Sequence, residues 1–408
     1  MEDKKTSANR LKISKFKLDS LLDITLSINA NLPTEELLSK YEHILRDNLG
    51  IGKILILKHS NTWECLLNGG FSKELEKIDV ESRLSGITEI AYVTPDLGFE
   101  GVDIILPVYN NNVHLAFVFI GDIEEEGEGM SPVIKHLNFI QTLSSIILVA
   151  IENIRLFNES LRQEAFKKEL ELAARMQKML IPDNSKMPKN SRMVINGFYF
   201  PHYEVGGDYY DCIKLSETKT GFCIADVSGK GISAAILMSN FQASLRALFT
   251  EDIMLETLVE KLNSIVVINA SGEKFITFFV ARYDHKSRVL EYINAAHNPP
   301  VLYNTSTGEI LQLKASCVGI GMLDEIPYVK KSELVIKDYT KIICYTDGLS
   351  ELKNIEGKDI GTEVIIKYIA NTLPVEGNIR EMIRDLGLPD DNPSTFDDVS
   401  ILAADLLK

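Results

Sequence analysis

A helical pattern of apolar residues runs with little interruption from about Val133 to Leu180, far longer than a typical globular helix. An approximate heptad repeat follows it but needs one extra four-residue step between Ala165 and Leu172. Such a stutter locally unwinds a coiled coil. Because a lone helix would leave this stripe in water, we expect two such helices from paired protomers. Packing against the rest of the same chain is the alternative.

The sequence patterns differ on the two sides of this helix, and 408 residues are enough to bury two hydrophobic cores. Pro182 and the polar segment behind it mark the boundary. We expect a flexible N-terminus, a regulatory domain, a helical coiled-coil linker and a catalytic domain. Their predicted ranges are 1–17, 18–156, 157–186 and 187–408.

In front of the long helix, apolar residues recur at helical spacing from Leu18 to about Leu49, and the break at Asn31–Pro33 predicts two helices. The strand-like runs that follow are Lys53–Leu57, Ile104–Tyr109 and His114–Ile120. Asn110–Asn112 would join the last two as a hairpin turn. The acidic segment Glu124–Gly129 is interpreted as a solvated turn.

Behind the linker the pattern changes to short strands separated by turns. The strand-like runs are 193–200, 221–225, 275–283, 289–294, 341–346 and 399–403, and the helical runs are 232–249, 254–269 and 361–370. Several neighbouring strands are linked only by turns, as at Asp284–Ser287, so the sheets should be largely antiparallel. The expected class is α+β, with helices packed outside the sheets.

Composition narrows the function and the compartment. A formal net charge of −15 argues against a nucleic-acid partner. The five cysteines are scattered singly without a C-x-x-C pair, which argues against a zinc site or a disulfide framework and favours a reducing cytoplasm. The charged N-terminus lacks the apolar core of a signal peptide. Since the most apolar stretch, Ile146–Ile151, is well short of the ~20 residues that cross a bilayer, we expect a cytoplasmic protein without a membrane span.

Four acidic sites share one local pattern, in which an apolar strand meets an aspartate beside a glycine or a turn. The aspartates are Asp208 with nearby Asp211, Asp226, Asp347, and the pair Asp397 and Asp398. A single aspartate beside a glycine is usually turn chemistry, because its side chain bonds its own backbone. Four such sites in one domain instead predict a cluster of carboxylates at strand ends.

Clustered carboxylates need cations, since two of them about 4 Å apart repel by roughly 4 kcal/mol at an effective dielectric constant near 20. Oxygen ligands without nearby histidine or cysteine select Mg2+ or Mn2+ over zinc. Two such ions can activate water for attack on phosphorus without a protein nucleophile. The sequence has no G-x-S-x-G motif and no phosphatase-type cysteine loop. The expected chemistry is metal-dependent hydrolysis of a phosphate ester.

From about Leu180 to Lys408 the motifs resemble those of the PPM (type 2C) metal-dependent serine/threonine protein phosphatases. The bacterial branch with the stage-II sporulation phosphatase and the stress-sigma-factor regulators is the most similar. The matching segments are Asp208, Asp226–Gly231, Asn294–Pro300, Asp347–Gly348 and Asp397–Asp398. The resemblance implies a β-sandwich flanked by helices, with two Mn2+ or Mg2+ ions at one end.

The resemblance also implies a set of site residues. The catalytic and metal-binding residues would be Asp208, Asp226, Asp347 and Asp397, with the backbone carbonyl of Val227 and Asp398 as further metal ligands. Asp208 and Asp226 would bind or bridge the ions, and Asp347 and Asp397 would hold the second ion. Asp398 is the weaker candidate of its pair, because the family's pattern places the metal carboxylate first.

Other residues near these motifs have more than one interpretation. His297 is either a proton donor to the leaving alcohol or a packing residue at a strand-to-turn corner, and we favour packing. Asp211 is expected to be a supporting or structural acid. Gly229–Gly231 lacks the spacing of a P-loop. Eukaryotic members of the family hold phosphate with an arginine ahead of the first metal motif, and here that segment is Tyr199–Glu204 without an arginine.

Residues from about Leu18 to Leu156 resemble a GAF domain in pattern, with helices, an antiparallel sheet and a helix leading out. Such a fold binds a small ligand, a chromophore or another protein, or serves to dimerise. Cys65 is interpreted as a packed apolar residue rather than a chromophore or redox thiol. We expect a signal at this domain to change the pairing of the linker helix and thereby assemble the metal site.

The expected function is hydrolysis of phosphoserine or phosphothreonine on a regulatory protein by a homodimer gated through its N-terminal domain. The resemblance implies a partner-switching pathway with a STAS-type anti-sigma factor antagonist as substrate. One alternative is a catalytically weak phosphatase fold kept as a binding or signalling module, and the complete aspartate set argues against it. Another is a nucleotide cyclase or similar GAF-linked enzyme, whose motifs are absent.

Overall fold

The computed structural model describes residues 2–60, 62–94, 98–110, 113–123, 136–190, 192–201, 205–353, 357–388 and 397–407. The chain folds into two compact units, Met1–Glu164 and Ala165–Lys408. Helix α4 (Leu137–Lys178) runs from the first unit into the second, so each unit contains part of it. The acidic segment Glu124–Gly129 and the centre of the hairpin turn at Asn110–Asn112 lie outside the described residues.

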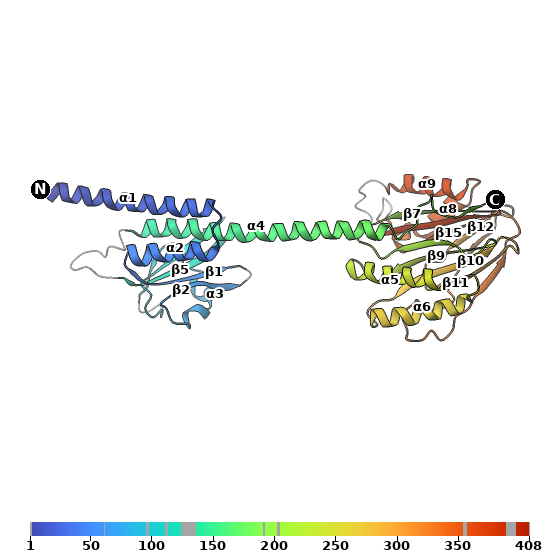
Figure 1. The fold of residues 1–408 in the computed structure, drawn as a ribbon, viewed down its shortest axis with the longest axis horizontal. Coiled ribbons are helices and arrows are strands. Elements are labelled where there is room, and N and C mark those ends of the chain that lie inside the picture. The colour runs from blue at the N-terminus through green and yellow to red at the C-terminus, as the bar shows by residue number, and fades with distance from the viewer. Residues whose placement is uncertain are drawn as a thin grey trace. The chain divides into compact units, whose positions relative to one another are not determined.

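The first unit is built on a five-stranded antiparallel sheet with the strand order β2-β1-β5-β4-β3 (Figure 1). The strands are β1 (Ile51–His59), β2 (Trp63–Gly69), β3 (Ala91–Tyr92), β4 (Ile104–Asn110) and β5 (Val113–Ile123). The helices before α4 are α1 (Glu2–Asn29), α2 (Thr34–His43) and α3 (Val80–Leu84), with short helical turns at Ile44–Asn48 and Leu75–Lys77.

Alternating side chains of β1 enter two different apolar cores. Ile54 and Ile56 pack with α1, α2 and the first part of α4. Leu55 and Leu57 pack with α3 and neighbouring aromatic side chains on the other face. This alternation is the period of two that an extended strand imposes. Both faces of the sheet are therefore covered, and β1 is a central strand between β2 and β5.

The predicted break between the first two helices is confirmed. α1 ends at Asn29, Asn31 adopts a left-handed φ of 53°, and Pro33 immediately precedes α2. Proline presets the φ of this entry position and its missing N–H costs nothing there. α1 begins at Glu2, so it covers most of the segment 1–17, whose flexibility stays a prediction. That segment contains no glycine or proline to interrupt a helix.

A buried ion pair joins the sheet to α4 in the first unit. The Nζ atom of Lys58 on β1 lies 2.5 Å from a carboxylate oxygen of Glu152, and the two side chains are 5% and 10% exposed. Arg155 binds the other oxygen of Glu152 at 2.8 Å and reaches Glu159 at the surface. Hydrogen bonds from Arg155 and then Lys58 lower the pKa of Glu152 to about 2, although burial opposes them. Glu152 therefore stays ionised in the folded protein at neutral pH.

Glu152→Gln is expected to destabilise the N-terminal unit by about 3–5 kcal/mol, because it leaves Lys58 charged and buried without its carboxylate. The measurement is urea unfolding followed by fluorescence of Trp63, the single tryptophan, which lies on β2. The stabilisation by Glu152 is complete above its ordinary pKa of 4.5 and is lost as the pH falls toward about 2. The difference between the variant and the wild type should shrink over that range.

Glu159→Gln is the matched control, since Glu159 also pairs with Arg155 but its side chain is 52% exposed. Exposed pairs of this kind contribute at most ~1 kcal/mol. Equal losses of stability in the two variants would contradict the role assigned to the buried pair.

The second unit contains two antiparallel sheets with helices on both outer sides (Figure 1). One sheet has the order β14-β11-β10-β9-β8 and the other the order β13-β12-β15-β16-β7-β6. The strands are β6 (Lys189–Asn190), β7 (Met193–Phe200), β8 (Tyr209–Lys214), β9 (Lys219–Val227), β10 (Ile276–Asp284), β11 (Val289–Ala295), β12 (Val301–Asn304), β13 (Ile310–Gln312), β14 (Ser332–Val335), β15 (Thr340–Tyr345) and β16 (Val399–Leu406). The helices are α5 (Ile232–Leu248), α6 (Leu255–Ala270), α7 (Asp347–Ser350), α8 (Gly361–Ile369) and α9 (Val375–Leu386).

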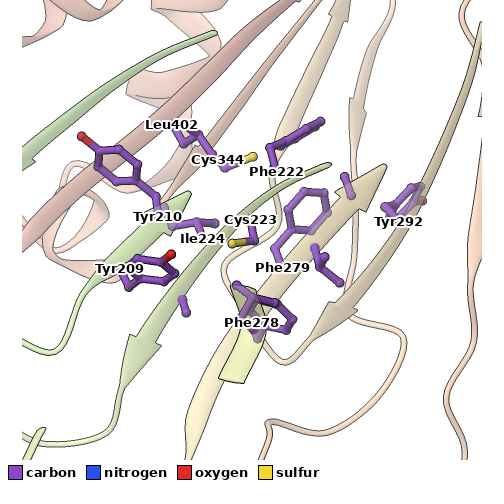
Figure 2. Close-up of a cluster of buried hydrophobic side chains, with 14 of the residues drawn as sticks. Tyr209, Tyr210, Phe222, Cys223, Ile224, Phe278, Phe279, Tyr292, Cys344 and Leu402 are labelled. Atoms are coloured by element: carbon purple, nitrogen blue, oxygen red, sulfur yellow. The ribbon is translucent and has the colours of Figure 1, made fainter. Parts of the chain in front are cut away.

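Apolar side chains from both sheets fill one continuous core. Figure 2 shows Phe222 and Cys223 of β9 together with Cys344 of β15 and Leu402 of β16, so the cluster spans both sheets. α5 and α6 cover the first sheet with side chains of the same core. A separate apolar cluster joins α8 and α9 to the outer face of the second sheet. The four layers are therefore helix, sheet, sheet and helix.

The predicted α+β class, with an antiparallel β-sandwich flanked by helices, is confirmed for this unit. Several of its elements were not predicted. β12, β13 and β14 are three or four residues long, too short to show an alternation. α9 contains Gly377, which lowers helix propensity, and β8 follows Asp208 so closely that it was interpreted as part of the acidic motif.

By length and composition alone, α4 could cross a membrane, and it is the one helix in the described part of the chain that meets this criterion. Of its most apolar 18-residue window, 56% is buried inside the structure. Leu143, Ile147 and Ile151 belong to the apolar core that α4 forms with the five-stranded sheet of the first unit. The apolar composition of α4 thus has an explanation within the folded unit.

Candidate metal centre

Antiparallel pairing brings four aspartate-bearing segments to one edge of the sandwich. Asp208 directly precedes β8, Asp226 lies near the end of β9, and these two strands are paired. Asp347 follows the end of β15, Asp397 precedes the start of β16, and these strands are also paired. In an antiparallel pair the start of one strand meets the end of the other. Each sheet therefore contributes two of the predicted aspartates to this edge.

The aspartate side chains interact between the two sheets. Besides burial, the charge of Asp226 raises the pKa of Asp208, so these two carboxyl groups lie close enough to repel each other when both are ionised. The charges of Asp347, Asp397 and Asp398 all act on Asp226, and the charge of Asp398 acts on Asp208. Residues from four distant places in the sequence thus share one electrostatic neighbourhood.

This neighbourhood opposes ionisation. Burial, and then repulsion by Asp226 and Asp398, raises the pKa of Asp208 well above its ordinary value. Burial, followed by the charges of Asp347 and Asp397, raises the pKa of Asp226 to about 8. Burial and Asp397 also raise the pKa of Asp347. A bound cation would favour the ionised carboxylates, and oxygen donors of this kind suit Mg2+ or Mn2+.

The positions of the side chains must also be compared with what a metal ion requires. Within the described ranges, no three acidic, histidine or cysteine side chains already surround one metal position. Asp397 faces the Nζ atom of Lys230 at 2.9 Å. The metal roles of the predicted residues therefore stay predictions, supported by the charges of the cluster.

Two adjacent glycines allow the segment before β8 to approach the other segments closely. A β-carbon at Gly206 would lie 1.7 Å from the Oδ2 atom of Asp398. A β-carbon at Gly207 would lie 2.9 Å from the carbonyl oxygen of Val227, the predicted backbone ligand. The N–H of Gly207 donates to the Oδ2 atom of Asp398 at 3.0 Å. Any side chain at position 206 would displace Asp398, so only glycine fits there.

The two members of the acidic pair have different surroundings. Asp398 is buried and binds the backbone of Gly207. Asp397 has a side chain that is 35% exposed and faces Lys230. Asp398 therefore supports the loop of Asp208, whereas the side chain of Asp397 is partly exposed to solvent.

Thr346 orients Asp208 and was not predicted from the sequence. Its Oγ1 atom donates to the Oδ2 atom of Asp208 at 2.7 Å and accepts from the N–H of Ser400 at 2.9 Å. This hydroxyl joins the end of β15, the start of β16 and the segment before β8. Its position directly before Asp347 is the one sequence signal that pointed to it.

Gln177, near the end of α4, binds the same glycine segment within the second unit. Its Nε2 atom donates to the carbonyl oxygen of Gly206 at 2.6 Å, and its Oε1 atom accepts from the N–H of Gly206 at 3.1 Å. The side chain is buried. The last turns of α4 are thus fixed to the residues that carry Asp208. In the sequence, the only feature that distinguishes Gln177 is that it is a polar residue within the apolar stripe of this helix.

The contacts of Asp211 and His297 indicate that both side chains stabilise the fold. The fully buried carboxylate of Asp211 receives hydrogen bonds from the Nε and Nη2 atoms of Arg246 at 2.7 and 3.0 Å, and from the hydroxyl of Tyr209. It fixes α5 to β8. His297 is buried, its Nδ1 atom lies 2.9 Å from the hydroxyl of Thr277, and burial lowers its pKa to about 4. It is therefore neutral at pH 7, which suits a packing residue better than a proton donor.

The sequence and fold of the second unit match known proteins. Residues 216–407 match the family model described as stage II sporulation protein E (SpoIIE). The C-terminal unit is therefore similar in sequence to this family, over just under half of the whole chain. Its fold is shared with the SiaA-PP2C domain of Pseudomonas aeruginosa, with a TM-score of 0.50 and 18% identity over 59% of this chain and 97% of that one.

Two curated proteins similar to this chain are phosphoserine phosphatases of Bacillus subtilis (strain 168). RsbU is 29% identical over 195 residues, which cover 48% of this chain and 57% of RsbU. RsbP is 26% identical over 189 residues, which cover 45% of this chain and 46% of RsbP. This chain thus spans about half the length of the curated relatives it matches.

Asp226→Asn is expected to stabilise the metal-free protein at pH 7 by about 1–4 kcal/mol, because the carboxyl group with its raised pKa must take up a proton on folding, whereas the amide need not. The measurement is thermal unfolding of the full chain in excess EDTA, followed by circular dichroism. Asp252→Asn, at an exposed aspartate, is the control and should change little. A lower melting temperature for Asp226→Asn would show that the carboxylate is satisfied without a cation.

Proposed function

We propose that this chain is a metal-dependent protein phosphatase that removes phosphate from phosphoserine or phosphothreonine on a regulatory protein. The observation that carries the proposal is the mutual repulsion of buried aspartates at one edge of a SpoIIE-type sandwich. Asp208, Asp226, Asp347 and Asp397 would hold two Mn2+ or Mg2+ ions, with the Val227 carbonyl and Asp398 in supporting positions. When bound, such ions supply an activated water and neutralise charge on the phosphate.

The chain's own residues prepare this site in three ways. Thr346 holds the carboxylate of Asp208 in one orientation through its hydroxyl. Asp398 fixes the glycine segment that precedes Asp208. The apolar core behind the strand ends excludes water from one side of the cluster, which strengthens each electrostatic interaction there.

The similarity to RsbU and RsbP supports a place in bacterial partner switching. We propose a small STAS-type anti-sigma factor antagonist in its phosphorylated form as the substrate, and the cytoplasm as the compartment. The negative net charge of this chain supports a protein substrate rather than a nucleic acid.

We further propose that a GAF-like N-terminal unit gates the phosphatase as part of a homodimer. Helix α4 supports this, because Glu152 is held in the first unit by a buried ion pair and Gln177 is bound to Gly206 in the second. Exposed apolar side chains between them suit the paired-helix arrangement. They are Leu156, Phe157, Leu161, Phe166 and Leu172. A change in helix pairing would act on Asp208 through Gln177.

Turnover of a phosphoserine peptide should require Mn2+ or Mg2+ and should fall at least a thousandfold in Asp226→Asn and in Asp347→Asn. The reason is that each variant removes a ligand charge on which transition-state stabilisation depends. Phosphate release is the measurement, with Asp252→Asn as the charge-matched control.

The runner-up function is a catalytically weak binding module, which the ion pair between Lys230 and Asp397 favours because a lysine there is an internal counter-cation. Metal-independent peptide binding without phosphate release in the wild type would support the module. Unchanged turnover in both aspartate variants would refute the site assignment.

Gln177→Ala should reduce turnover by about tenfold without unfolding the chain, because it removes both hydrogen bonds that fix Gly206. The matched control is Arg175→Ala on the same helix. The Nε atom of Arg175 donates to the backbone carbonyl oxygen of Glu171 within that helix. Activity and Mg2+ affinity are measured for both. Equal values for Gln177→Ala and the wild type would remove the link between α4 and the site.

A further inference from the structure

A phosphatase of this kind must attract a dianionic phosphate toward a strongly acidic site. The cluster holds five carboxylates, at Asp208, Asp226, Asp347, Asp397 and Asp398. Two divalent cations would still leave one negative charge in excess. A cationic side chain of the protein at the position where the phosphate arrives would offset this remaining charge. The arginine that eukaryotic relatives use is missing, since the segment from Tyr199 to Glu204 has none.

Lys230 lies where such a cation is required. Its Nζ atom is 2.9 Å from the Oδ2 atom of Asp397, and its charge lowers the pKa of Asp347. The side chains of Lys230 and Asp397 are 39% and 35% exposed, so their pair is at the solvent side of the cluster. Buried Asp208, in contrast, lies at its inner side. A substrate that approaches from solvent meets the lysine before it meets the buried carboxylates.

The loop that carries Lys230 holds its backbone in a defined conformation. Gly229 and Gly231 flank the lysine with left-handed φ angles of 79° and 80°. A β-carbon at Gly231 would meet nothing within 4 Å, so open space adjoins the loop. Lys274 supports it from the neighbouring segment, because its Nζ atom donates to the carbonyl oxygen of Ser228 at 2.8 Å. The backbone is thus fixed, while the Lys230 side chain has room to move.

The ion pair itself is weak enough to be exchanged. Pairs between partly exposed lysine and aspartate contribute only ~0–1 kcal/mol. A charge-assisted hydrogen bond to a phosphate oxygen is stronger, typically ~1.5–3 kcal/mol. Helix α5 begins at Ile232, directly after the loop, without a side-chain cap, so its N–H groups add to the positive potential beside Lys230.

We propose that Lys230 is the phosphate-binding residue of this site, exchanging Asp397 for an oxygen of the substrate's phosphate group. This inference rests on the proposed phosphatase function and names the residue that recognises the substrate. No bond is made or broken in the exchange, because the ammonium group only changes its hydrogen-bond acceptor. The P-loop interpretation of Gly229–Gly231 is not needed, since one lysine on a glycine-flanked turn is sufficient.

The test uses the full chain loaded with Mg2+ and titrates inorganic phosphate, the reaction product, by isothermal calorimetry. Lys230→Gln should weaken phosphate binding about ten- to hundredfold. Lys230→Arg should stay within about threefold of the wild type, because it keeps the charge. Affinity for Mg2+, titrated separately, should be as tight in Lys230→Gln as in the wild type or tighter, since the lysine no longer competes for Asp397.

Lys214→Gln is the matched control. Lys214 also forms an exposed pair, 2.5 Å from Glu217, but it lies at the opposite end of β8 from Asp208. The phosphate affinity of the Lys214→Gln variant should equal that of the wild type. With a phosphoserine peptide, Lys230→Gln should raise KM by a similar factor to the loss of phosphate affinity, and Lys214→Gln should not.

Each result has a definite meaning. Wild-type phosphate affinity and KM in Lys230→Gln would overturn the assignment, and so would a loss of Mg2+ binding, which would show that the lysine only maintains the loop. If the wild type hydrolyses the peptide in either case, the phosphatase function survives and the lysine assignment alone fails. A wild type that binds neither Mg2+ nor phosphate would overturn both.

Discussion

Repulsion among buried carboxylates is the constraint on which the architecture of the second unit depends. The antiparallel strands place Asp208, Asp226 and Asp347 at one edge, with an apolar core behind them. Hydrogen bonds from Thr346 and the backbone of Gly207 stabilise part of this arrangement. The remaining repulsion is what a bound cation would relieve, so the stability of the folded unit and the proposed cation binding would be linked.

The sequence predicted this edge well because its causes are local. Each aspartate directly adjoins an apolar strand or a glycine turn, and strands joined by short turns must pair antiparallel. The supporting contacts were not predictable in the same way. Gln177 and Gly206 are 29 residues apart and Gly207 and Asp398 are 191 apart. Nothing in either local sequence indicates the partner, so tertiary packing alone decides these contacts.

Helix α4 has an uncommon position, because its side chains are fixed by polar contacts in both compact units. Glu152 is held by Lys58 and Arg155, and Gln177 is held by the backbone of Gly206. The two hydrogen bonds of Gln177 contribute ~1 kcal/mol each, so breaking both would change a conformational equilibrium by roughly tenfold or more. A modest rotation or shift of one helix therefore has enough energetic effect to regulate the site without unfolding either unit.

The place of β16 in its sheet has a consequence for biosynthesis. β16 is the last strand of the unit, yet it lies between β15 and β7, and Met193 near the start of the domain pairs with Leu406 near its end. Until the ribosome has released this segment, β7 lacks its neighbour and Gly207 lacks the carboxylate of Asp398. The edges of β7 and β15 that β16 covers in the folded domain therefore stay unpaired until this last strand has been made.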